Sequence, residues 1–165
     1  MDYQPLPAPQ NGSAFLVGGP GFVFLKRQVA GLDPGRTYRA VFAAQIATQW
    51  SAQCYYTDDG PWSTYVRAGA TMVEPSNRVE TAGVPPYVFQ HVLPDFDLTS
   101  TGVVLGDIAN SQPCLSKVWE MKTLQSTAAV SLTADSTGRV WLYQGVNALA
   151  GLPVYFVTTS ATLSK

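Results

Sequence analysis

Hydrophobic and polar residues alternate most regularly in the stretch that follows a tight-turn signal near residue 34. The signal is Asp33-Pro34-Gly35, in which proline pre-sets φ and glycine accepts a positive φ. In the strand predicted after it, one side carries Tyr38, Ala40, Phe42, Ala44 and Ile46. The other side carries Thr37, Arg39, Val41, Ala43 and Gln45. The first set predicts a core face, and the mixed second set is typical of an antiparallel sheet whose other face is partly wet.

The rest of the chain divides into short extended segments separated by turn residues. Alternation or short apolar runs predict strands over residues 13–17, 22–29, 63–73, 87–93, 102–109, 116–124, 128–134, 139–145 and 154–163. Prolines on both sides of residues 87–93 indicate an edge strand. The connection Asp135-Ser136-Thr137-Gly138 predicts a hairpin between the segments that flank it.

These segments predict the fold class. No segment keeps helical periodicity over three turns, and 14 glycines and 12 prolines punctuate the chain. We therefore expect an all-β protein of eight to ten strands, an antiparallel two-sheet β-sandwich of the jelly-roll or galactose-binding-like kind. No internal repeat or composition shift marks a second domain. The expected organisation is one domain over residues 13–165, preceded by an extended Pro-rich arm over residues 1–12.

Composition and charge narrow the function classes. The 165 residues suffice for a real core, and only 13% of them are charged, with a net charge of −1. Because the ten Lys and Arg residues are scattered, the chain has no electrostatic footprint for nucleic acid. No apolar run reaches the roughly 20 residues of a transmembrane helix. The opening residues also lack the basic and apolar regions of a signal peptide, so we expect either a cytosolic protein or one whose leader is absent from this sequence.

The two cysteines, Cys54 and Cys114, allow two readings. They are too few for a zinc cage and too far apart for a redox motif. A disulfide between them would close a loop of about 60 residues and place the protein outside the cytosol. Two buried free thiols in a reducing compartment are the alternative. We favour the disulfide, and with it a secreted, periplasmic or cell-surface location.

Several short motifs occur in order along roughly three quarters of the chain. They are Phe24-Leu25-Lys26, Gly31-Leu32 with Pro34-Gly35 and Thr37-Tyr38, Tyr65-Val66-Arg67-Ala68-Gly69-Ala70 with Glu74-Pro75, Val104-Leu105-Gly106-Asp107-Ile108-Ala109-Asn110, Trp119-Glu120 with Lys122-Thr123-Leu124, and Trp141-Leu142 with Gly145. On these motifs the chain resembles a group of uncharacterised bacterial secreted proteins and lipoproteins whose β-sandwiches look like carbohydrate-binding modules. The resemblance implies the fold and export, and it implies no particular catalytic activity.

Candidate catalytic residues do not form a recognisable constellation. His91 is the only histidine and no Gly-x-Ser-x-Gly elbow exists, so a nucleophilic triad is not predicted. Loop carboxylates could serve a glycan hydrolase or lyase, with Asp58 or Asp59 paired to Asp95 or Asp97. We keep such an enzyme as an alternative and assign no catalytic residue.

A structural calcium ion is a weaker possibility. Asp107 and Asn110 lie at a strand end and could supply oxygen ligands, although no spacing matches an EF-hand. The structural interpretation is that Asp107 caps a turn by accepting hydrogen bonds from backbone amides, and we favour it. No other cofactor is predicted.

The aromatic loop between residues 50 and 62 is the strongest indication of a ligand-binding surface. It combines Trp50, Tyr55, Tyr56 and Trp62 with Asp58 and Asp59. Flat rings beside carboxylates suit sugars, because sugar C–H faces stack on aromatic rings while acids accept hydroxyl protons. Equally, one or two of the rings could cover the Cys54 bridge, whereas Trp119 and Trp141 lie in apolar strands and are expected in the core.

The first hypothesis is therefore a non-catalytic, exported module that binds carbohydrate or another extracellular ligand through this loop. A structural or assembly module with an exposed strand edge is a further alternative.

Overall fold

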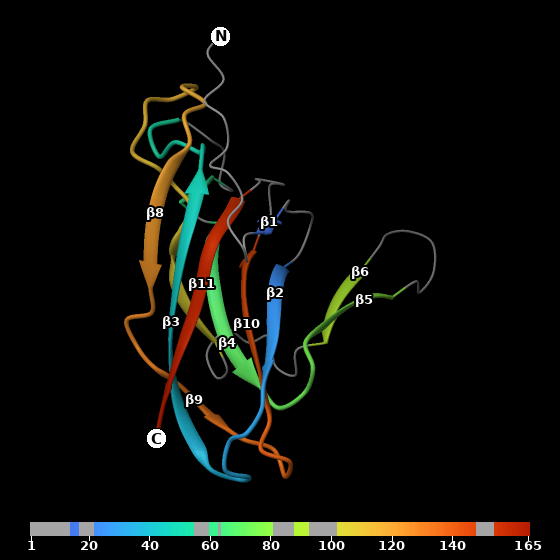
Figure 1. Ribbon diagram of the computed structural model, residues 1–165. Helices are drawn as coiled ribbons and strands as arrows, with labels where there is room; N and C mark the ends of the chain where they lie inside the picture. Colours follow the sequence, from blue (N-terminus) through green and yellow to red (C-terminus); the bar gives the residue numbers. More distant parts are fainter. Residues whose placement is uncertain are drawn as a thin grey trace.

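The computed structural model is all-β (Figure 1). It describes residues 14–16, 22–54, 60–62, 64–80, 88–92, 102–147 and 154–165, and these hold eleven strands and no helix. The predicted arm over residues 1–12 lies outside the described residues, as does the expected continuation of the first strand to residue 17.

Nine strands form two antiparallel sheets that pack face to face. The β3 sheet contains β1 (Ala14–Leu16), β11 (Val154–Ser164), β3 (Thr37–Thr48), β8 (Glu120–Gln125) and β9 (Val130–Thr133). The β10 sheet contains β2 (Phe22–Val29), β10 (Val140–Asn147), β4 (Tyr65–Thr71) and β7 (Gly102–Asp107). A separate pair, β5 (Ser76–Glu80) and β6 (Val88–Val92), lies beside the β10 sheet in Figure 1. The predicted antiparallel two-sheet sandwich is confirmed.

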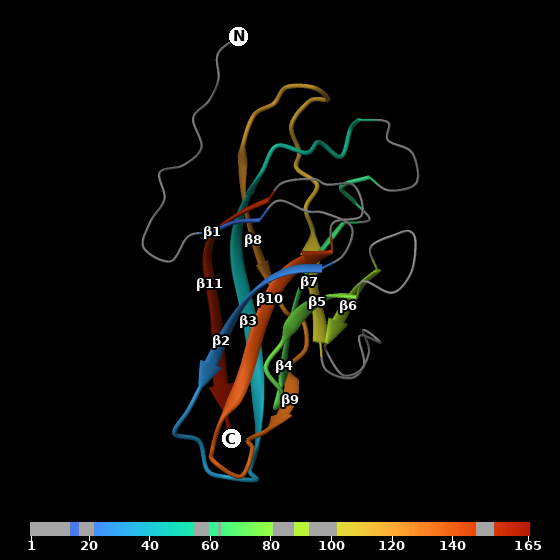
Figure 2. The ribbon, with the colours of Figure 1, turned by 90° about the vertical axis from the view of Figure 1, so that its right-hand side faces the viewer.

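The strands pair in a nested order. β1 pairs with β11, β2 with β10, β3 with β8 and β9, and β4 with β7, always antiparallel. Within the sandwich, β1 to β4 therefore pair with strands from the second half of the chain (Figure 2). β1 to β4 alternate between the two sheets, whereas β8 and β9 follow each other in the β3 sheet.

β3 lies at the centre of this arrangement. It pairs with β11 along one edge and with β8 and β9 along the other. Its predicted core face is confirmed, since Ala40, Phe42 and Ile46 are fully buried and Tyr38 and Ala44 nearly so. On the opposite face, the predicted set from Thr37 to Gln45 is exposed or partly exposed, whereas Ala47 is buried in a small satellite cluster. Period-two burial therefore orients this strand as the sequence predicts.

Two tight connections cross between the sheets at the end away from β1. The β2–β3 turn donates from Leu32 N to the carbonyl of Gly138 (3.0 Å) and from Gly35 N to that of Ala134 (3.1 Å). At Gly138, φ is 71°, and an added Cβ would collide with the carbonyl oxygen of Leu32. Only glycine fits there, because the residue combines a left-handed backbone with a close approach of another chain segment.

The hairpin predicted around residues 135–138 is wrong in its pairing. The turn itself forms, and Asp135 N donates to the carbonyl of Arg139 (3.0 Å). Its two strands then separate, because β9 joins β3 in one sheet while β10 joins β2 and β4 in the other. Alternation along each strand is the same in a hairpin and in a crossover, so the sequence pattern could not distinguish them.

The structure also departs from the predictions at β5 and at two tryptophans. β5 (Ser76–Glu80) lies between the strands predicted over residues 63–73 and 87–93 and was not predicted. Trp141 is half-buried on the outer face of the β10 sheet, in register with Gln28 and Thr71, because its neighbours Val140 and Leu142 face inward. Trp119 is also only partly buried and packs on a small satellite cluster.

An ion pair joins the two sheets along one side of the sandwich. Lys122, on edge strand β8, donates from Nζ to Asp107 Oδ1 (2.7 Å) and to the carbonyls of Asp107 (2.9 Å) and Ala109 (3.0 Å). Asp107 ends β7, the edge strand of the opposite sheet. The ammonium group of Lys122 thus bridges one lateral edge of the sandwich and donates three hydrogen bonds there.

Candidate functional site

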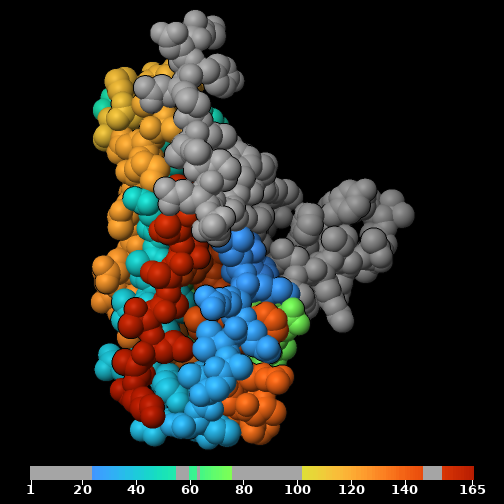
Figure 3. Space-filling view, viewed as in Figure 1, coloured from blue at the N-terminus to red at the C-terminus, as the bar shows by residue number. Residues whose placement is uncertain are grey.

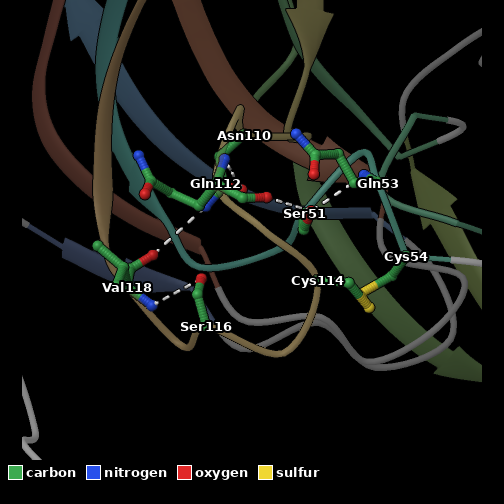
Figure 4. The surroundings of a disulfide bond; sticks show 8 residues. All are labelled: Ser51, Gln53, Cys54, Asn110, Gln112, Cys114, Ser116 and Val118. Carbon is green, nitrogen blue, oxygen red and sulfur yellow. Dashed lines mark hydrogen bonds between the residues drawn. A yellow bond between two sulfur atoms is a disulfide. The ribbon is translucent and has the colours of Figure 1, made fainter.

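The predicted disulfide is present and joins the β3–β4 loop to the β7–β8 loop. The Cα atoms of Cys54 and Cys114 are 4.7 Å apart, and 60 residues separate the two cysteines in sequence (Figure 4). Cys54 is buried and Cys114 is exposed. We call the two bridged loops, residues 49–54 and 108–119, the disulfide end.

Hydrogen bonds hold the two loops together independently of the disulfide. Asn110 N donates to the carbonyl of Trp50 (2.8 Å), and Ala52 N donates to the carbonyl of Asn110 (3.0 Å). These bonds form a short parallel bridge between Ser51 and Asn110. Ser51 Oγ adds a bond to the carbonyl of Gln112 (2.5 Å) (Figure 4). The disulfide end is therefore a cross-linked, hydrogen-bonded unit.

Asn110 acts as an internal staple of this unit. Its side chain is almost completely buried, and Nδ2 donates to the carbonyls of Thr48 (3.1 Å) and Val118 (3.4 Å). Its Oδ1 accepts a hydrogen bond from Gln112 N (3.2 Å). Both ends of the amide are therefore committed to the protein's own backbone.

Asp107, the other predicted calcium ligand, is committed as well. Its Oδ1 accepts from Lys122 Nζ and from the backbone N–H of Ala109 (2.9 Å). This geometry is that of a turn cap, the structural role that we favoured for Asp107 from the sequence. In the part of the chain that the structure describes, no group of three or more His, Cys, Asp or Glu side chains is placed to hold a metal ion. The geometry around Asp107 and Asn110 therefore favours a structural role for both.

Glu120 is a second polar anchor at the disulfide end. Its Oε2 accepts from Ser111 Oγ (2.8 Å), Gln112 Nε2 (3.0 Å) and Ser111 N (3.1 Å). Hydrogen bonds from Gln112 and Ser111, with a smaller effect from Lys122, hold the pKa of Glu120 below its ordinary value. The ionised carboxylate therefore fixes the start of the β7–β8 loop at neutral pH.

The predicted aromatic ligand site is only partly within the described residues. Tyr55, Tyr56, Asp58 and Asp59 lie outside them, and so do Asp95 and Asp97 of the alternative enzyme reading. The backbone of His91 lies in β6, opposite Asn77 of β5, so it belongs to a two-stranded pair with no central strand. No described geometry brings these carboxylates together.

The two described tryptophans of the loop differ in exposure. Trp50 is partly buried and packs against the main core. Trp62 is 39% exposed, and an added Cβ at Gly60 would lie 2.5 Å from its ring, so the indole lies directly over that glycine. Gly60, Pro61 and Thr64 are all buried around it.

The turn that carries Trp62 is anchored on both sides. Thr64 Oγ1 donates to the carbonyl of Gly60 (3.3 Å), and Ile108 N donates to the carbonyl of Thr64 (3.1 Å). Ile108 itself is fully buried and begins the second loop of the disulfide end. The turn that carries Trp62 is therefore hydrogen-bonded, through Thr64 and Ile108, to the cross-linked loops of the disulfide end.

Sequence reasoning missed a second feature, a groove between β2 and β11 in which Gln144 is buried. The available signal was a glutamine within the otherwise apolar run Trp141–Val146. A single buried polar residue does not reveal from sequence which other strand it faces.

Comparisons of the chain with protein-family models, with curated protein sequences and with solved structures give no match. Within the described residues, no helix has the length and apolar character that a membrane crossing requires.

Proposed function

We propose that this protein is a non-catalytic binding module that recognises carbohydrate through the face of Trp62. The observation that carries the proposal is the exposed indole of Trp62 on a turn whose other described residues are buried. A flat aromatic ring on a fixed support is suited to stacking against the C–H face of a sugar. Because Gly60, Pro61 and Thr64 are buried and Thr64 is hydrogen-bonded to Gly60, we expect little conformational entropy to be lost when a ligand binds.

The surrounding chemistry supports the same proposal. The loop sequence supplies Tyr55, Tyr56, Asp58 and Asp59 between the disulfide end and Trp62, so rings and hydroxyl-accepting carboxylates are close in sequence to the platform. Trp50, at the other end of the loop, packs against the main hydrophobic cluster, so it anchors the start of the loop to the core. The nested strand order supports assigning the sandwich to the jelly rolls, a class that includes lectin domains.

We also propose that the protein works outside the cytosol. Disulfides persist in oxidising compartments and are rare where thioredoxin and glutathione keep thiols reduced. The Cys54–Cys114 bridge supports export.

A glycan array tests the proposal. The wild-type protein is expected to bind at least one glycan class, and Trp62→Ala is expected to lose most of that binding with little change in melting temperature. Met72→Ala, which truncates a more exposed apolar side chain immediately after β4, is the matched control and should bind normally. Failure of the wild type to bind any glycan, or equal binding by Trp62→Ala, would refute the proposal. Release of sugar products that Asp58→Asn abolishes would show an enzyme instead.

A further inference from the structure

On the lateral edge opposite the Lys122–Asp107 ion pair, no described strand joins β2 to β11. Between β2 of one sheet and β11 of the other lies a groove of about 410 Å³. Its apolar lining consists of Leu25, Val29, Leu142, Ala161 and Leu163. Figure 3 looks onto this side of the molecule, with β2 in blue next to β11 in red. The volume falls in the range of ligand-binding clefts.

The two strands that border the groove have unpaired edges. β11 pairs with β3 along one edge, whereas on its other edge β1 covers only residues 154–156. The stretch from Thr158 to Ser164 therefore has no strand partner on that edge among the described residues. β2 pairs with β10 alone within the same described set. Backbone N–H and C=O groups at such edges are templates for another strand.

The side-chain amide of Gln144 has an unpaired hydrogen-bond acceptor at the groove. The residue is 6% exposed, and its Nε2 donates to the carbonyl of Ser160 on β11 (2.8 Å), which fixes the orientation of the amide. Its Oε1 is buried and has no hydrogen-bond partner among the described residues. Since buried carbonyl oxygens are almost always paired, a donor from an occupant of the groove would complete this site.

Charge and ring placement indicate which occupant fits. Arg27 lines the groove, is exposed, and forms no ion pair with any described residue. The one aromatic residue of the lining, Tyr143, contacts Phe24 edge-on, on the opposite face of the β10 sheet. The groove therefore offers aliphatic surface and backbone edges without a stacking platform, which suits a polypeptide better than a sugar.

We propose that the groove binds an extended, acidic peptide segment of a partner protein by strand addition to β11. Alternate side chains of the peptide are apolar and fill the groove over Leu142 and Ala161. Its backbone pairs with the free edge of residues 158–164 and donates to Gln144 Oε1. A peptide carboxylate pairs with Arg27. Main-chain pairing provides affinity and the groove selects the side chains, as in other cases of strand addition.

A pool of short synthetic peptides tests the proposal. In each peptide an apolar residue (valine, leucine, isoleucine or phenylalanine) alternates with threonine, and one central threonine is replaced by glutamate. Binding is measured by fluorescence anisotropy, and the best peptide is expected to protect the amides of residues 158–164 from hydrogen exchange. N-methylation of the peptide amides on one edge should abolish binding, because it removes the donors that pair with β11.

Matched variants localise the binding. Ala161 faces the groove and Thr162, its neighbour, points to the other face of the β3 sheet. Ala161→Phe should weaken binding at least about tenfold, whereas Thr162→Phe places the same aromatic ring outside the groove and should leave binding unchanged. Arg27→Glu, at an exposed position, should reverse the preference of the protein from glutamate-containing to lysine-containing peptides. This charge exchange tests the site even if Ala161→Phe proves unstable.

Several results would overturn the proposal. They are the absence of binding by the whole pool, unchanged binding after N-methylation, and retention of the glutamate preference by Arg27→Glu. Self-association of the wild type that Ala161→Phe abolishes would instead assign the groove to a second copy of this chain.

Discussion

Removal of the disulfide should destabilise the protein substantially while leaving the disulfide end folded. The bridge closes a loop of 60 residues. In the chain-entropy model, a cross-link over about 60 residues restricts the unfolded state by roughly 4 kcal/mol at 25 °C. In the native state, the hydrogen bonds of Asn110 and Ser51 still join the two loops. We therefore expect the double variant Cys54→Ala, Cys114→Ala to fold and to lose about 4 kcal/mol of unfolding free energy.

Urea unfolding followed by circular dichroism measures this loss. For a protein of this size, roughly 4 kcal/mol corresponds to a fall in melting temperature of about 10 °C. The m-value should rise, because an unfolded chain without the cross-link exposes more surface. Wild type unfolded in the presence of a reductant provides the control and should match the double variant.

Single variants separate the entropic effect from packing. Cys54 is buried and Cys114 is exposed, so a packing effect would act mainly at Cys54. If the cross-link itself is the cause, Cys114→Ala alone should lose nearly as much stability as the double variant. A loss below about 1 kcal/mol in the double variant, with an unchanged m-value, would refute this reasoning.

Three further predictions concern single side chains. Gly138→Ala should destabilise by more than about 2 kcal/mol in thermal unfolding, because strain at positive φ adds to a collision with Leu32. Gly31→Ala has a similar φ in open space and should lose only about 1 kcal/mol, and equal losses would contradict the collision argument. Lys122→Met should lose about 1–2 kcal/mol in urea unfolding, since three hydrogen bonds between the sheets disappear, and a neutral result would show that this ammonium group does not stabilise the sandwich. For Glu120, a lowered pKa means that its contribution is present above the ordinary value of 4.5 and is lost as pH falls through the folded-state pKa. Wild type should therefore exceed Glu120→Gln in stability at pH 7 and converge with it in acid, and a difference that is independent of pH would contradict the assignment.

Local patterning determined a large part of this fold. The alternation of Tyr38, Ala40, Phe42, Ala44 and Ile46 placed the central strand and its core face correctly. The same signal located most of the other described strands to within a few residues. This succeeds because side chains of a strand alternate between its faces, so burial on one face is written directly into a period of two.

Strand pairing was decided only by the tertiary structure. The turn at residues 135–138 joins β9 in one sheet to β10 in the other. The alternation of residues along either strand does not indicate this change of sheet. The outward orientation of Trp141 has the same origin, since it follows from the register with Gln28 and Thr71. β5 was not predicted because only one of its five residues is apolar, too few to show the alternation of a strand.

The candidate sites depend on contacts between segments that are far apart in sequence. Cysteine composition suggested the Cys54–Cys114 bridge, but the commitment of Asp107 to Lys122 and of Asn110 to backbone carbonyls required the two sheets to meet. The groove at Gln144 likewise exists only because β2 and β11 border the same open edge from opposite sheets. A sequence specifies which face of each strand is buried through local periodicity, whereas the pairing of distant strands arises from competition among many possible registers that only the complete fold resolves.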